Sequence, residues 1–276
     1  MLKQRILTAA VLIPLLLAAL FYLPLFWIHL LFGAVIAAAA WEWAALSGLQ
    51  STAFKAAYVF FLLLLGGLCL FAVLSNPSMM FSFAAVASLW WLWALMELVI
   101  HREIGRGMFT TAVSRMVGGF LVLVPLWVAS GFLMANDDQR PRALLFLLVL
   151  VWTADTAAYF AGTWLGKTKL APHISPGKTV EGVVGGLLGV VLLAWLCGTM
   201  LWKFESDQLV RWIALAAITA LFSVAGDLTE SKLKRVAGVK DSGNLLPGHG
   251  GMLDRIDALC AAAPVFVFGG MILLKH

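Results

Sequence analysis

Charged residues are scarce in this chain of 276 residues, where Asp, Glu, Lys and Arg together make up 12%. The hydrophobic fraction is 62% and the mean hydropathy is +0.97. A water-soluble domain of this length does not need so much apolar surface, and long apolar runs recur from end to end. The composition therefore excludes an ordinary soluble protein. It predicts an all-α polytopic membrane protein.

Cysteine and histidine are also few, with three and five residues, and the chain has no CxxC pair and no His cluster. Cys69, Cys197 and Cys260 each lie in an apolar run and are expected to be small buried hydrophobes. Without Cys ligands or clustered His, a zinc site is not expected. A basic domain interleaved with aromatic residues is missing as well, so nucleic acid is not an expected partner.

Nine apolar stretches are long enough to cross a bilayer, which takes about 20 residues. We interpret the first as a retained span, because no convincing small-residue cleavage site follows it. A tight hairpin around Pro24 is expected between the first two. The expected spans lie at about 6–22, 26–46, 56–75, 81–100, 116–134, 143–166, 182–201, 209–228 and 259–274.

The distribution of basic residues predicts the orientation. With the N-terminus in the cytoplasm, 14 of the 19 Lys and Arg residues fall on the cytoplasmic side. The two most polar connections, 167–181 and 229–258, then share that face and can meet. We therefore expect an N-terminal scaffold of about five helices (1–142) and a C-terminal region of about four helices (143–276) that carries the chemistry.

Ten of the charged side chains crowd into the 32 residues from Gly226 to Asp257. Desolvating ions is costly, so a charge cluster between apolar segments indicates a function. Asp254 and Asp257 open the last helix at a spacing of three. The preceding Gly-rich turn, LPGHGG, lets backbone N–H groups approach a phosphate or carboxylate closely.

The sixth span carries one acid, Asp155, inside an apolar run. Asp155, Tyr159, Gly162 and Gly166 are spaced by 4, 3 and 4, which places them on one helix face. We interpret Asp155 as part of a polar cavity. The alternative is a buried hydrogen bond between helices.

The following loop contains Lys178 and Thr179, which can contact phosphate oxygens. It is not a P-loop, because Pro172 occupies the position of the first glycine. The alternative for this loop is ordinary lysines that reach toward the membrane surface.

Further polar residues follow helical spacing around the eighth span. Ser223, Asp227 and Ser231 recur every four residues, and they form a polar stripe if the helix continues past the bilayer. In the first half of the chain, Glu42 and Glu97 lie near span ends. Both are expected to be interfacial carboxylates paired with a nearby base or with water.

Carboxylates without Cys or clustered His favour Mg²⁺ over Zn²⁺. Carboxylates combined with Lys, Arg and a glycine turn suit phosphoryl or nucleotidyl transfer. The residues alone thus indicate a metal-dependent enzyme that acts on a phosphorylated substrate at the cytoplasmic membrane face. They leave the substrate open.

The run from Ser231 to Asp257, S-K-L-K-R-x4-K-D-S-G-x2-L-P-G-H-G-G-M-x-D-R-I-D, resembles the signature of the phosphatidate cytidylyltransferases, or CDP-diglyceride synthases, of bacteria. The upstream segments D-T-A-A-Y-x2-G-x3-G and S-P-G-K-T-V-E-G are similar to that family too. The resemblance covers about 150–257. The first five spans are similar only in hydropathy and length.

The resemblance implies that CTP and phosphatidic acid react to CDP-diacylglycerol and pyrophosphate, with Mg²⁺ alone or together with K⁺. It implies a homodimer among the lipids of the bacterial inner membrane, with the active site facing the cytoplasm. Asp227 and Asp254 match the acids of the family's metal site. The residues assigned to catalysis are Asp227, Asp254, Lys234, Arg235, Lys240, Asp241, His249 and Asp257. Those assigned to substrate binding are Asp155, Ser175, Lys178, Thr179, Ser223, Ser231 and Arg255.

Other functions fit the sequence less well. A transporter or channel would use Asp155 and Asp227 as an ion relay, but it needs polar residues through the full bilayer depth, and here they crowd the cytoplasmic half. The D-G-x2-A-R-x8-G-x3-D-x3-D pattern of the CDP-alcohol phosphotransferases is missing. Prenyl transfer needs DDxxD, which Asp137 and Asp138 do not begin. A structural scaffold leaves the charge cluster unexplained.

Overall fold

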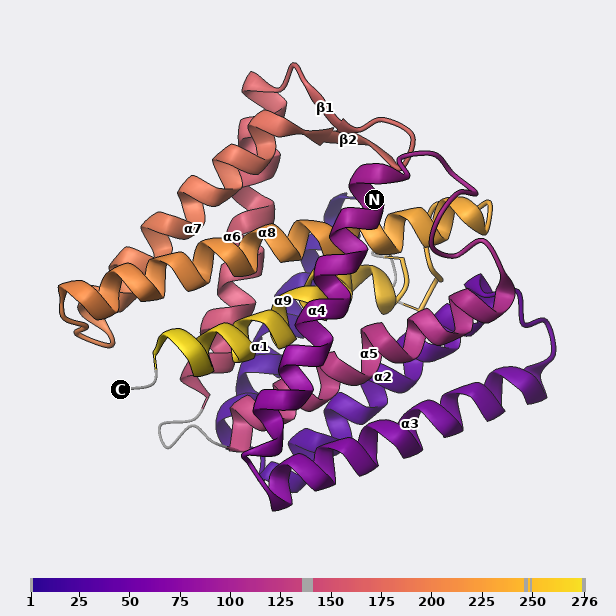
Figure 1. Cartoon of the computed structure of the whole chain (residues 1–276), viewed down its shortest axis with the longest axis horizontal. Coiled ribbons are helices and arrows are strands. Elements are labelled where there is room, and N and C mark those ends of the chain that lie inside the picture. Colours follow the sequence, from indigo (N-terminus) through magenta and orange to yellow (C-terminus); the bar gives the residue numbers. More distant parts are fainter. Residues whose placement is uncertain (1, 136–140, 246–247, 249, 275–276) are drawn as a thin grey trace.

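The computed structural model describes the backbone of residues 2–135, 141–245, 248 and 250–274, and the side chains from residue 10 onward. This part of the chain forms nine α-helices and two short β-strands (Figure 1). The helices are α1 (Leu2–Tyr22), α2 (Leu25–Leu46), α3 (Thr52–Ser75), α4 (Met79–Ile100), α5 (Ala112–Ala135), α6 (Arg142–Leu165), α7 (Val180–Met200), α8 (Ser206–Val236) and α9 (Leu253–Leu273). The strands are β1 (Lys169–Ala171) and β2 (Ser175–Thr179).

The helices confirm the all-α membrane fold. Within the described residues, the eight helices α2 to α9 are long and apolar enough to cross a bilayer. The first expected span, 6–22, lies in α1, whose described apolar part, Ala10–Tyr22, is shorter than a full span. The predicted break at Pro24 is confirmed, because Pro24 directly precedes α2 and its carbonyl accepts hydrogen bonds from the next turn.

Two sets of helices meet at α9. Helices α2, α3 and α5 pack together, and α6, α7 and α8 form a second set. Helix α9 packs along α8 and also against α4 and α5 (Figure 1). The C-terminal helix thereby ties the two halves of the chain together, and α5 and α9 are the most buried of the spanning helices.

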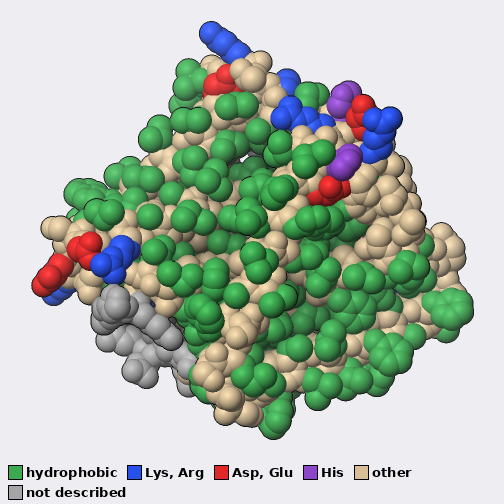
Figure 2. Space-filling view, in the orientation of Figure 1, with side chains coloured by type: hydrophobic (Ala, Val, Ile, Leu, Met, Phe, Trp, Pro, Cys, Tyr) green, Lys and Arg blue, Asp and Glu red, His purple; other side chains and the backbone are tan. Residues whose placement is uncertain are grey.

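Apolar side chains cover most of the outer surface. Figure 2 shows them across the middle of one face, with the charged side chains gathered at two edges. Large side chains such as Trp164 (76% exposed) and Phe71 (71% exposed) point outward. So large an exposed apolar surface would be unfavourable in water, whereas it is favourable in contact with the lipid chains of a bilayer.

Helix α8 is longer than a membrane crossing. Its 31 residues give a length of about 46 Å, whereas the hydrocarbon core is about 30 Å thick. The helix continues eight residues beyond the expected span end at residue 228. The continuation of the helix, on which the predicted polar stripe depends, is thus confirmed.

The loop between α6 and α7 contains the antiparallel hairpin β1–β2, which the sequence analysis did not predict. Thr179 is the last residue of β2 and the N-cap residue of α7. Its hydroxyl accepts a hydrogen bond from the Gly182 N–H (3.1 Å) and so caps the helix. At the other side, Arg235 Nε at the end of α8 donates to the Ile174 carbonyl (3.2 Å). This contact confirms that the two polar connections meet.

Candidate active site

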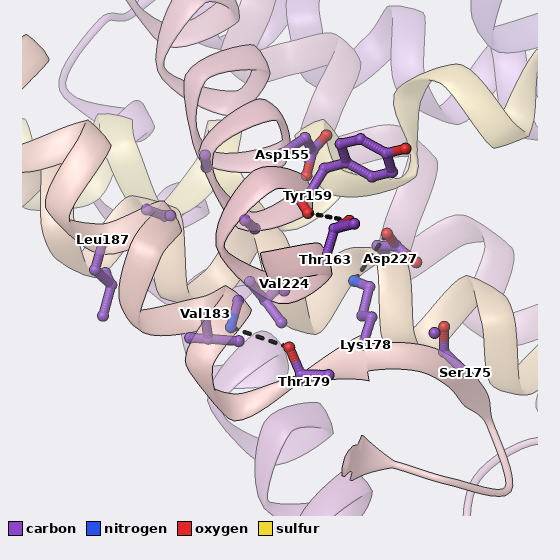
Figure 3. A pocket seen from close by; sticks show the side chains of 17 residues that line it. Asp155, Tyr159, Thr163, Ser175, Lys178, Thr179, Val183, Leu187, Val224 and Asp227 are labelled. Atoms are coloured by element: carbon purple, nitrogen blue, oxygen red, sulfur yellow. Dashed lines mark hydrogen bonds and ion pairs between the residues drawn. The ribbon is translucent and has the colours of Figure 1, made fainter. Parts of the chain in front are cut away.

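A cavity of about 560 Å³ opens between α6, α7, α8 and β2 (Figure 3). Its polar side is formed by side chains from three of these elements: Asp155, Ser175, Lys178 and Asp227. Small and apolar residues of α6, α7 and α8 form the remaining wall: Ala154, Ala158, Gly182, Gly186, Leu187 and Val224. The cavity is therefore amphiphilic, with charge at one end and a hydrocarbon-like surface along its side.

An ion pair crosses the polar end of this cavity. Lys178 Nζ of β2 lies 2.8 Å from Asp227 Oδ2 of α8, and both side chains are half-buried (Figure 3). The Ser231 hydroxyl, one turn further along α8, donates to Asp227 Oδ1 (3.2 Å). Asp155 of α6 interacts electrostatically with both Lys178 and Asp227. Lys178 thus contacts Asp227 directly, while Asp155 interacts with both groups at longer range.

A second charged group lies at the start of α9. Lys234 Nζ lies 2.6 Å from both Glu230 Oε2 and Asp254 Oδ1. Asp254 Oδ2 accepts hydrogen bonds from the Ser242 N–H and hydroxyl (3.0 Å each) and from the Gly251 N–H (2.8 Å). These donors fix the Asp254 carboxylate in one orientation.

Asp257 lies between the two charged groups. A Cβ at Gly226 would meet the Asp257 carbonyl oxygen at 2.5 Å, so α8 and α9 are in backbone contact here. The Asp257 carboxylate interacts electrostatically with Asp227, and Glu230 interacts with Asp257 and Asp254. The acids of α6, α8 and α9 therefore lie in one charged region together with Lys178 and Lys234, as the sequence predicted for most of them.

The remaining predicted residues differ in their surroundings. Lys240, Asp241 and Arg255 are exposed at the rim, and Arg255 interacts electrostatically with Asp155. Ser223 is buried and donates to the Ala220 carbonyl of its own helix (2.8 Å). It is not among the residues that line the described cavity. His249 lies outside the described residues.

Comparison with known proteins places this site in a family. The model of the cytidylyltransferase family matches residues 3–272. The chain belongs to this family. A phosphatidate cytidylyltransferase of Pseudomonas aeruginosa is 40% identical over 267 residues, which cover 96% of each chain. One from Haemophilus influenzae is 37% identical over 97% of this chain and 98% of its own. The protein is thus a nucleotidyltransferase enzyme, in agreement with the resemblance of its signature.

The relatives also include a shorter match to the phosphatidate cytidylyltransferase of Thermotoga maritima. It is 44% identical over 139 residues, about half of each chain. In the present chain, the charged residues of the described cavity come from α6, β2 and α8, which all belong to the C-terminal region.

Two acids near this site were not assigned to it from the sequence. Glu230 is 2% exposed and contacts Lys234; its spacing of four from Lys234 was the available signal. Glu42 was expected to pair with a base or water at the interface, and this is wrong. Its carboxylate is buried and accepts hydrogen bonds from the Ser242 hydroxyl and two N–H groups of α9. For Glu97 the expected base is confirmed, since His101 Nδ1 lies 2.9 Å from Glu97 Oε2.

The carboxylates of Asp227 and Asp254 are oxygen donors of the kind that could hold a hard cation. No group of three or more His, Cys, Asp or Glu is arranged as a complete metal site within the described part of the chain. Mg²⁺ is usually bound through one or two carboxylates, with phosphate and water oxygens completing its shell. Asp227 meets this requirement beside the cavity. Asp254 Oδ1 contacts Lys234 alone among the described residues, so it also retains room for a second ligand.

Proposed function

We propose that this protein transfers the cytidylyl group of CTP to phosphatidic acid, giving CDP-diacylglycerol and pyrophosphate, at the cytoplasmic face of a bacterial inner membrane. The observation that carries the proposal is the Lys178–Asp227 pair at the mouth of an amphiphilic cavity. The full-length relatives named phosphatidate cytidylyltransferase support the choice of substrates.

The shape of the cavity suits a lipid phosphate. A headgroup phosphate can lie at the charged end, while the acyl chains follow the wall of Ala154, Gly186 and Leu187 toward the bilayer. This wall is apolar, so contact with an acyl chain would remove hydrocarbon surface from water. A water-soluble phosphate ester would leave this apolar wall unused.

In the proposed reaction, a phosphate oxygen of phosphatidic acid attacks the α-phosphorus of CTP. A new P–O bond forms, the bond between the α-phosphorus and the bridging oxygen breaks, and pyrophosphate leaves. The attacking oxygen is already anionic, so little help from a general base is needed. Lys178 and Lys234, with Arg235, Lys240 and Arg255 nearby, would offset the charge of the lipid phosphate and of pyrophosphate.

We assign the cation, Mg²⁺ alone or together with K⁺, to Asp227 and Asp254. When bound, it would offset negative charge on the triphosphate and stabilise the leaving pyrophosphate. Asp227 is the first choice because it lines the cavity. Asp254 is already oriented by Ser242, Gly251 and Lys234, so it needs little rearrangement.

The cytoplasmic orientation is supported by the bias of Lys and Arg. The hairpin β1–β2 and the end of α8 lie together at one edge, where Figure 1 shows both. CTP is a cytoplasmic metabolite, so the site must open on that side. The homodimer implied by the resemblance stays a prediction.

The test uses purified protein in detergent micelles with phosphatidic acid, Mg²⁺ and radiolabelled CTP. We expect label in the lipid phase, and none after EDTA or in the Asp227→Asn variant. Asp207→Asn is the matched control, because Asp207 lies at the opposite end of α8 with a side chain 75% exposed. Folded protein that leaves the lipid phase unlabelled with Mg²⁺ and K⁺ present would refute the proposed substrates.

A further inference from the structure

Glu42 of α2 contacts the segment between α8 and α9. These contacts differ from the pairing with a base or water at the membrane interface that the sequence predicted. Glu42 Oε2 accepts from the Ser242 hydroxyl and from the Leu253 N–H, both at 2.8 Å. Glu42 Oε1 accepts from the Met252 N–H at 2.9 Å. We call the described residues 242–245, 248 and 250–253 the signature loop. A single carboxylate therefore binds both ends of this loop from about 200 residues away in sequence.

The surrounding backbone is shaped around this carboxylate. Glu42 is 7% exposed. A Cβ at Gly243 would lie 2.6 Å from Glu42 Oε1, and one at Gly251 would collide with Glu42 Oε2 and the Ser242 hydroxyl. Glycine at these two positions lets the loop close onto Glu42 without a side chain in between.

Glu42 also supplies what the start of α9 lacks. The N-cap residue of α9, Met252, makes no side-chain cap hydrogen bond, and the first N–H groups of a helix have no partner within it. The Met252 and Leu253 N–H groups find theirs in Glu42. Neither Lys nor Arg pairs with Glu42 among the described residues, so its negative charge is stabilised by these N–H dipoles.

The contacts continue from Glu42 into the charged site. The Ser242 hydroxyl that donates to Glu42 also lies 3.0 Å from Asp254 Oδ2, within reach of the same proton. Asp254 in turn contacts Lys234 at 2.6 Å. One hydroxyl thus links a carboxylate of the N-terminal helices to the carboxylate assigned to the cation.

We propose that Glu42 is a positioning residue for nucleotidyl transfer, holding both ends of the signature loop so that Asp254 faces the triphosphate. This inference rests on the proposed function, which assigns Asp254, the residue that directly follows this loop, to the cation on the triphosphate. Glu42 does not touch the reacting atoms; it acts through Ser242 and the start of α9. It gives the N-terminal half of the chain a part in the reaction.

The first measurement is hydrogen–deuterium exchange on the full-length protein and its Glu42→Gln variant. Gln keeps the size of the side chain but presents one oxygen and an NH₂ group to three donors. We expect amides of the signature loop to exchange at least about tenfold faster, since charge-assisted hydrogen bonds are lost. Exchange in the middle of α8 should be unchanged. Glu103→Gln is the matched control, because Glu103 has a side chain 62% exposed on another loop.

The second measurement is steady-state kinetics with both substrates varied. We expect Glu42→Gln to raise the KM for CTP about tenfold and to lower kcat, with the KM for phosphatidic acid within about twofold. A merely structural role would lower the active fraction, and so kcat, while leaving both KM values unchanged. Glu42→Asp keeps the charge but shortens the side chain, so it should recover part of the loss.

The outcomes separate the two proposals. If the wild-type protein does not use CTP, the proposed function falls, while the exchange comparison still decides whether Glu42 holds the loop. If Glu42→Gln does not fold, Ser242→Ala removes one of the three contacts and should shift exchange and the KM for CTP in the same direction by less. Loop exchange and a KM for CTP equal to wild type in a folded Glu42 variant would overturn the inference.

Discussion

Lys178 of β2 and Asp227 of α8 face each other at the polar end of the cavity, with Nζ and Oδ2 2.8 Å apart (Figure 3). The pair joins the polar connection 167–181 to the end of the eighth expected span, just before the second polar connection begins. It also places a cationic and an anionic group where a phosphate and its counter-cation would both bind. The two residues are therefore expected to act as a unit.

A double-mutant cycle tests this coupling. We expect Asp227→Asn and Lys178→Met each to lower kcat about 100-fold or more, because charge stabilisation of the transition state is lost. The double variant should be about as slow as the worse single variant, since residues acting as a unit are not additive. Turnover in phosphatidic acid micelles measures this. Multiplicative losses would mean that the two residues act independently.

Removing Lys234 should destabilise the fold as well as the reaction. Lys234→Met leaves Glu230, 2% exposed, and Asp254 without their shared counter-charge. Breaking a buried pair in this way typically costs about 3–5 kcal/mol. Thermal unfolding in detergent should show a clear drop. Lys240→Met, at an exposed position, should unfold within about 0.5 kcal/mol of wild type; equal unfolding of the two variants would contradict the account.

The backbone contact at Gly226 predicts a third effect. An alanine Cβ there would lie 2.5 Å from the Asp257 carbonyl oxygen and 3.2 Å from Ala261 Cβ, so α8 must move away from α9. We expect Gly226→Ala to lose about 1–3 kcal/mol of stability and to lower activity, because Asp227 shifts relative to Asp257. Gly67→Ala is the control, since a Cβ at Gly67 meets nothing within 4 Å. That change should be neutral or slightly stabilising.

The orientation predicts labelling from one side only. In a background without Cys69, Cys197 and Cys260, a cysteine at position 240 should react with a membrane-impermeant thiol reagent in inside-out vesicles. A cysteine at position 207, at the other end of α8, should react only in right-side-out vesicles or cells. The reverse pattern would place the site on the wrong face for CTP.

Much of this arrangement follows from local sequence rules. The hydropathy pattern predicts the positions of the helices, because an apolar segment that crosses a bilayer must pair its backbone polar groups internally, as an α-helix does. Helical spacing placed Asp227 and Ser231 together, and their contact is confirmed. The spacing of Glu230 and Lys234 likewise corresponds to a close pair.

Other features arise from contacts that no local pattern specifies. Glu42 meets the Ser242 hydroxyl because α2 and α9 pack together, which neither segment encodes alone. Ser223 follows the same spacing as Asp227 but bonds to its own helix, since a buried hydroxyl can use the carbonyl three residues earlier. The β1–β2 hairpin is too short for an alternating pattern to be read.

The fate of the individual phosphates of CTP tests the central claim most directly. Parallel reactions with phosphatidic acid and Mg²⁺ would contain CTP labelled with ³²P at either the α or the γ position. Cytidylyl transfer predicts that α label enters the lipid phase, that γ label remains in water as pyrophosphate, and that Asp227→Asn abolishes both changes. Label from the γ position in the lipid would show phosphoryl transfer instead and would contradict the proposed reaction.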